Sequence, residues 1–91
     1  MPEKLFNKIK LMFFHAPWCG QCKAYTPTVH KVVVETGVQF VDINADEDMS
    51  LCEQYGIMNL PVVILVNGDK KVRIDGMVSK ENLLDKLNSI M

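Results

Sequence analysis

Two cysteines separated by two residues, Cys19 and Cys22, are the side chains of this sequence best suited to chemistry. They follow an apolar segment and stand where a helix can begin, so free amides and the helix dipole would stabilise a thiolate at Cys19. Lowering a thiol pKa from about 8.5 to about 7 takes roughly 2 kcal/mol, which a partly buried helix N-terminus can largely supply. Cys19 is therefore predicted to attack a disulfide, and Cys22 to resolve the mixed disulfide.

A structural zinc site is the alternative for this pair, because two cysteines at this spacing also form half of many zinc sites. Zinc needs four ligands, and the other candidates, Cys52, His15 and His30, are scattered over separate predicted elements. No second pair of cysteines at this spacing occurs. The sequence favours reversible disulfide chemistry without a metal or another cofactor.

Length and composition predict one domain, residues 1–91, with one core. A net charge of -1 with interspersed charges gives no basic stripe for nucleic acid, and no apolar stretch approaches the length of a membrane span. Three cysteines fit a reducing compartment with one catalytic pair and Cys52 as a spare core thiol. We expect a soluble, cytoplasmic monomer.

The hydrophobic pattern predicts strands and helices in alternation. A strand, a helix and a second strand with a short return imply a right-handed parallel crossover, so part of the sheet should be parallel. The predicted elements are strand 9–14, helix 19–35, strand 38–43, a short helix that ends at Gly56, strand 62–66, a turn at Asn67-Gly68, an edge strand over 71–75, and a helix capped by Ser79. In the short helix, the acidic residues 46–48 are placed in the first turn, and Met49, Cys52 and Tyr55 on the buried face.

The motif and the order of the elements together resemble the thioredoxin superfamily over nearly the whole chain. The segment 16–23 resembles its active site, and Pro27 stands where that family has a helix kink. Leu60-Pro61, after Tyr55-Gly56-Ile57, resembles the approach to its cis-proline, and Asp75-Gly76 resembles the end of its last strand. The resemblance implies an α/β minimal thioredoxin fold, β-α-β-α-β-β-α, with a four-stranded mixed sheet and helices on both faces. It would lack the extra N-terminal strand and helix.

The resemblance also implies roles for individual residues. Pro61 would be cis and would hold the backbone of Leu60 opposite the cysteines, where an extended substrate segment could pair with it. For the apolar residues around the motif, ordinary core packing is the alternative to a docking surface. The implied docking surface comprises Trp18, Met58, Leu60, Pro61, Gly76 and Met77, and the supporting residues are His15, Gly20, Gln21, Lys23 and Pro27.

Departures from the family pattern leave the proton acceptor for Cys22 open. Phe13 stands where thioredoxins have a buried carboxylate, and Phe40 is assigned to the place of a nearby lysine. Gln21 replaces a proline. His15 could substitute for the missing carboxylate if its ring faces the site; the alternative is a polar side chain near a strand end.

The leading functional hypothesis is a small reductase of protein disulfides that receives electrons from a donor of the thioredoxin reductase type. A glutathione-dependent glutaredoxin is the second reading. Asn59-Leu60-Pro61, Gly76-Met77 and Gly20-Gln21 stand in place of its Thr-Val-Pro segment, its double glycine and its active-site tyrosine. The third reading is a binding module that docks a partner around Leu60, with the cysteines incidental.

Overall fold

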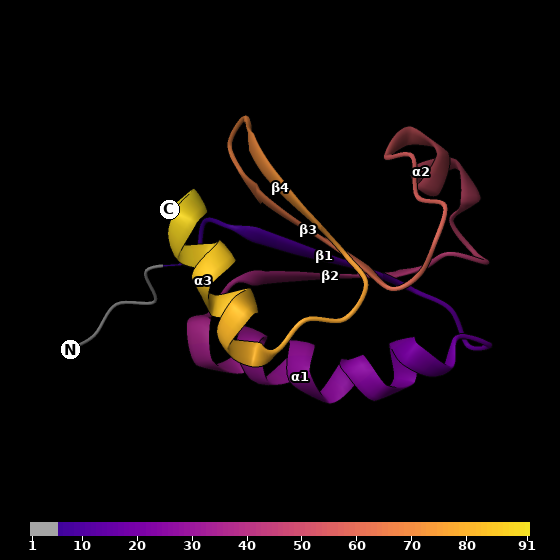
Figure 1. Cartoon of the computed structure of the whole chain (residues 1–91). Coiled ribbons are helices and arrows are strands. Elements are labelled where there is room, and N and C mark those ends of the chain that lie inside the picture. The colour runs from indigo at the N-terminus through magenta and orange to yellow at the C-terminus, as the bar shows by residue number, and fades with distance from the viewer. Residues whose placement is uncertain (1–5) are drawn as a thin grey trace.

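A computed structural model describes residues 6–91, in which strands and helices alternate as the hydrophobic pattern predicts (Figure 1). The sheet has the strand order β2-β1-β3-β4, with β1 and β2 parallel and both other pairings antiparallel. The expected four-stranded mixed sheet is confirmed. Within the described residues only a turn precedes the first strand. The elements are β1 (Lys10–His15), α1 (Gly20–Thr36), β2 (Gln39–Asn44), α2 (Met49–Gln54), β3 (Val62–Asn67), β4 (Lys70–Asp75) and α3 (Lys80–Ile90).

Helices cover both faces of the sheet, as the resemblance implied. Alternate side chains of β1 point to opposite faces, and because residues 11–14 are all apolar and buried, both faces need a cover. On one face, Leu11 and Phe13 pack with residues of α1 and α3, among them Tyr25 and Leu83. On the other face, Phe14 packs in the cluster that contains Cys52 of α2. Figure 1 shows α1 and α3 together on one side and α2 apart from them.

Helix α1 continues through Pro27 without interruption, as predicted. Proline at this position cannot donate to the carbonyl of Lys23, while the hydroxyl of Thr26 donates to the carbonyl of Cys22 at 2.8 Å. The helix ends at Gly37, whose φ of 75° is left-handed and whose N–H donates to the carbonyl of Val33 at 2.9 Å. No helix in residues 6–91 is long and apolar enough to cross a bilayer.

The surroundings of α2 differ from the prediction in two respects. Asp48 is the N-cap, and its carboxylate accepts from the N–H of Leu51 at 3.3 Å, so residues 46–48 precede the helix instead of forming its first turn. Met49 is not on the buried face but is 66% exposed. The physical reason is length: six residues make less than two turns, and only Cys52 is buried.

The C-terminal half follows the predicted pattern closely. The β3–β4 turn lies at Gly68-Asp69, one residue later than predicted, and Gly68 has a φ of 63°. Ser79 caps α3 by accepting from the N–H of Asn82 at 3.1 Å. Lys80 Nζ reaches Glu35 Oε2 at 2.5 Å, which joins α3 to α1.

Candidate active site

A disulfide joins Cys19 and Cys22 at the N-terminus of α1. Cys19 is the N-cap itself, and its Sγ accepts a hydrogen bond from the backbone N–H of Cys22 at 3.2 Å. After reduction, this amide and the helix dipole would stabilise negative charge on Cys19 Sγ. The predicted placement of both cysteines at the helix start is confirmed. The helix begins one residue later than expected, so Cys19 caps it instead of lying in its first turn.

The two cysteines differ slightly in exposure. Cys19 is 7% exposed and Cys22 only 2%, and both pack with Ala16 and Leu60. A substrate sulfur can therefore approach Cys19 more readily, while Cys22 lies beneath it. The first turn beyond them is open, since Gly20, Gln21 and Lys23 are all exposed.

The Leu60–Pro61 peptide bond is cis, as the resemblance implied. Leu60 packs against the cysteines, so this loop faces the disulfide. The carbonyl of Pro61 accepts from the N–H of Gly76 at 2.9 Å, and Gly76 has a φ of 80°, a conformation that a side chain would disfavour. The proline loop and the end of β4 are thereby held together beside the cysteines.

The apolar residues around the motif lie at the surface. Trp18 is 69% exposed, Met58 89% and Met77 46%, so core packing is wrong for these three residues. Leu60 is half-buried. The family-implied positions therefore supply exposed apolar area beside the disulfide.

The indole of Trp18 is held by a carboxylate that sequence reasoning missed. Its Nε1 donates to both oxygens of Asp46, at 3.0 and 3.1 Å. The predicted parallel pairing could have indicated this contact, since β1 and β2 are parallel and the carboxyl ends of parallel strands share one edge of the sheet. The segment after β2 must therefore lie beside the motif that follows β1.

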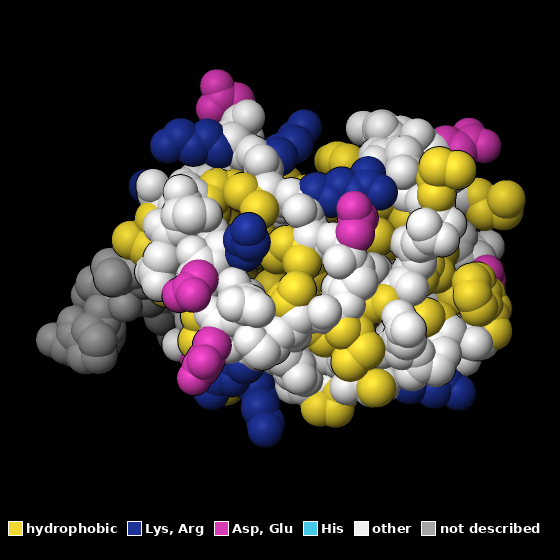
Figure 2. Space-filling view, in the orientation of Figure 1, with side chains coloured by type: hydrophobic (Ala, Val, Ile, Leu, Met, Phe, Trp, Pro, Cys, Tyr) yellow, Lys and Arg dark blue, Asp and Glu magenta, His cyan; other side chains and the backbone are white. Residues whose placement is uncertain are grey.

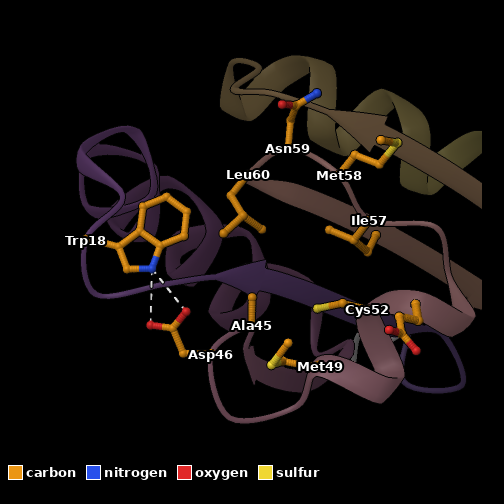
Figure 3. Close-up of a pocket in the computed structure, with 10 residues that line it drawn as sticks. Trp18, Ala45, Asp46, Met49, Cys52, Ile57, Met58, Asn59 and Leu60 are labelled. Carbon is orange, nitrogen blue, oxygen red and sulfur yellow. Dashed lines mark hydrogen bonds between the residues drawn. The ribbon is translucent and has the colours of Figure 1, made fainter.

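A pocket of about 520 Å³ opens next to Trp18, between the motif loop, α2 and the proline loop (Figure 3). Figure 3 shows Trp18 and Leu60 at one end and Met49, Cys52 and Ile57 farther along. On the space-filling surface, hydrophobic side chains emerge on the side where Figure 1 places α2 (Figure 2). The lining residues are Trp18, Ala45, Asp46, Met49, Cys52, Glu53, Ile57, Met58, Asn59 and Leu60.

His15 lies against Asp42 on the α1 side of the sheet. Its ring stacks on Phe13 with centroids 5.0 Å apart, and its Nε2 contacts Asp42 Oδ1. The strand register pairs Phe13 with Asp42 and places Phe40 opposite Leu11. The Phe40 ring lies on the same side of the sheet, with its centroid 6.5 Å from that of Phe13, and the residue paired with Phe13 on β2 is an acid, Asp42.

Cys52 is a free, buried thiol, as predicted. Burial raises its pKa, and the nearby charge of Asp48 raises it further. Because the thiolate is the reactive form, Cys52 is a poor nucleophile at neutral pH. Within residues 6–91, no three His, Cys, Asp or Glu side chains gather in a way that could hold a metal ion.

Comparison with known proteins agrees with this geometry. The sequence model of the thioredoxin family matches residues 3–89. A thioredoxin of Mycoplasma genitalium is 34% identical over 91 residues, which cover 96% of this chain and 89% of that protein. The chain belongs to the thioredoxin family.

Solved thioredoxins share the fold. Thioredoxin NaTrxh from Nicotiana alata superimposes with a TM-score of 0.83 at 31% identity, covering 96% of this chain and 76% of its own. A mutant thioredoxin from Halobacterium salinarum gives a TM-score of 0.85 at 28% identity, covering 92% and 75%. With a Cys19–Cys22 pair at disulfide distance and relatives named thioredoxin, the chain is a thiol-disulfide oxidoreductase that reduces protein disulfides. The glutaredoxin and binding-module readings are not favoured.

Proposed function

We propose that this protein acts as a single domain in which Cys19 attacks and Cys22 resolves. The Cys19 thiolate attacks one sulfur of a substrate disulfide, and the other substrate sulfur leaves as a thiolate that takes up a proton. The Cys22 thiolate then attacks Cys19 Sγ, which forms the internal disulfide and releases the second substrate thiolate. The observation that carries this assignment is the hydrogen bond from the Cys22 amide to the Sγ of the more exposed cysteine, Cys19.

The substrate segment is proposed to lie over the cis-proline loop. There the exposed side chains of Trp18, Met58 and Met77 offer apolar contact, and the half-buried Leu60 connects that surface to the disulfide. An extended segment beside Leu60 can also add backbone hydrogen bonds. Gly76 anchors the loop through Pro61 and leaves the approach free, since no atom lies within 4 Å of where its Cβ would be.

The remaining motif residues are assigned supporting roles. Gly20 leaves space above the disulfide, with no atom within 4 Å of a Cβ built there. Lys23 is proposed to add positive charge near the Cys19 thiolate, and Gln21 to influence the redox potential from between the cysteines. Pro27 is proposed to influence the direction of α1 after the cysteine motif.

His15 and Asp42 are proposed to handle the proton of Cys22. Phe13 fills the core between β1 and Tyr25 of α1 with no titratable atom, whereas the His15 ring stacked on it is in contact with a carboxylate. The residue after His15, Ala16, packs on both cysteines. A base near this position would raise the thiolate fraction of Cys22 when it must attack.

Replacing His15 with glutamine should slow release of the mixed disulfide by about tenfold, because the step loses its base. The measurement is stopped-flow release of a substrate thiol across pH 5 to 9, where the variant should lack one ionisation that the wild type shows. His30→Gln is the matched control, since the other histidine is exposed on α1 and packs on Phe40. An unchanged pH profile for His15→Gln would remove His15 from the mechanism.

The proposed setting is a reducing cytoplasm, in which the protein serves redox homeostasis as a monomeric electron carrier. The buried, unpaired Cys52 supports a reducing compartment, because disulfide-stabilised secreted domains seldom keep such a thiol. The proposed partners are proteins that contain disulfides and a donor of the thioredoxin reductase type. No nucleic acid or membrane partner is proposed.

The proposed function is tested by reduction of insulin disulfides with dithiothreitol as the electron source. The protein should accelerate insulin precipitation well above the dithiothreitol background. A glutathione mixed disulfide offered in parallel should be turned over slowly. Fast turnover of the glutathione substrate with no effect on insulin would favour the glutaredoxin reading instead.

A further inference from the structure

The pocket beside Trp18 carries a negative charge that the exchange reaction does not need. Asp46 and Glu53 are among its lining residues, and none of the lining residues is Lys, Arg or His. Glu47 and Asp48 are exposed in the same short segment. The sequence has no Lys, Arg or His from residue 32 to residue 69, although the net charge is only -1. The acidic bias is thus concentrated around this pocket and its flanking elements.

Two cations of β4 contact the C-terminal end of α2 and do not line the pocket. Lys71 Nζ lies over the Tyr55 ring, 5.7 Å from its centroid, at the C-terminal end of α2. Arg73 donates to the carbonyls of Tyr55 and Gly56 at 2.8 and 3.2 Å and pairs with Asp75. In residues 6–91, Asp46 and Glu53 form no ion pair. The Asp46 carboxylate accepts from the Trp18 indole but its charge is not neutralised by a cation, and the exposed Glu53 carboxylate can pair with a cation from outside.

Apart from the polar Asn59, the remainder of the lining is apolar, and part of it is adaptable. Met49 and Met58 are unbranched thioethers that can adjust to a guest side chain, and Trp18 presents an indole ring whose edge is fixed by Asp46. A Lys or Arg side chain suits such a surface, because its aliphatic stem packs on apolar groups while its charge stays at a polar rim. An arginine can also stack on the indole.

Leu60 connects this pocket to the reacting sulfurs. It lines the pocket and also packs against Cys19 and Cys22. The pocket is thus close enough to the disulfide for a side chain of the segment that carries the substrate cysteine to enter it. A free ion or a distant part of the substrate would not couple to the reaction in this way.

We propose that this pocket is a specificity subsite that selects substrate proteins whose reactive disulfide is flanked by an arginine or a lysine. The inference rests on the proposed function and names the substrate class for the same site. Opposite charges across the contact favour the correct partner, and like charges reject acidic segments.

The test uses three peptide disulfides that differ at one residue: arginine, citrulline or glutamate. Citrulline keeps the shape of arginine without the charge, and the residue is placed in turn at each position within three of the cysteine. At low salt, kcat/KM for the arginine peptide should exceed that of the citrulline peptide about fivefold at one position or more. The preference should shrink as salt is raised, and the glutamate peptide should be the slowest.

Glu53→Lys is the decisive variant, because Glu53 is exposed and its substitution reverses one charge at the rim. It should reduce the preference for arginine to about one or reverse it. Asp85→Lys makes the same charge change on the exposed side of α3, outside the pocket, and should keep the preference. If both variants lost the preference equally, the effect would be one of net charge and the subsite would be rejected.

Failure of the subsite and failure of the proposed function give different results. Equal kcat/KM for the arginine and citrulline peptides at every position, with insulin still reduced, overturns the subsite alone. Loss of all peptide and insulin reduction overturns the proposed function as well. A dimer in solution that Glu53→Lys dissociates would show that a second copy occupies the pocket, and would also overturn the subsite.

Discussion

Replacing Cys19 with serine should lower insulin reduction to the rate of dithiothreitol alone. A serine hydroxyl cannot supply a thiolate at neutral pH, and no other group in the site can take its place. Cys22 is 2% exposed and lies beneath Cys19, and burial raises the pKa of the Cys52 thiol. The rate of insulin precipitation measures the loss directly.

Cys52→Ser is the matched control for this variant. It removes the third thiol and should leave insulin reduction unchanged, because Cys52 belongs to the cluster under α2 and lies outside the disulfide. Circular dichroism of both variants would show whether each one folds. Insulin reduction by a folded Cys19→Ser protein at the wild-type rate would contradict the assigned nucleophile.

Replacing Cys22 with serine should stop the reaction halfway and trap a covalent complex with the substrate. Cys19 can still attack, but the mixed disulfide has no internal thiolate to resolve it. One substrate chain per protein should accumulate, visible by mass spectrometry and released by excess dithiothreitol. Net turnover with limiting reductant should fall to background.

The opposite trapping result would contradict the assignment of Cys19 as the nucleophile. If Cys19→Ser trapped the substrate and Cys22→Ser did not, the buried sulfur would be the nucleophile. The hydrogen bond from the Cys22 amide to Cys19 Sγ would then have no role in activation. Equal trapping by both variants would show that the site does not distinguish its two sulfurs.

Much of the fold was predictable because its signals are local. The apolar run of residues 11–14 requires a strand buried on both faces, and Ser79 and Gly37 mark helix ends through their own chemistry. The cysteine pair was likewise placed by its short motif, whereas the cis bond at Pro61 was implied only by the resemblance to the thioredoxin superfamily. Met49 was misplaced because helical spacing alone does not tell how many turns reach the sheet.

The parts that sequence reasoning missed depend on register between strands. Asp42 faces the same side of β2 as Phe40, so alternation alone did not show that an acid pairs with Phe13. The hydrogen bonds from Trp18 to Asp46 join residues 28 apart, and only the parallel pairing of β1 and β2 brings them together. The pocket and its acidic rim follow from that same pairing.

The most direct test of the account is the reduction potential of the Cys19–Cys22 pair. The protein is equilibrated with buffers in which the ratio of reduced to oxidised dithiothreitol is known. The fraction of protein with a reduced pair is then measured from the mass added by alkylation. A reductase of protein disulfides predicts a value near about -270 mV, as in thioredoxins. A value near about -120 mV would make the chain an oxidant of thiols and would contradict the proposed function.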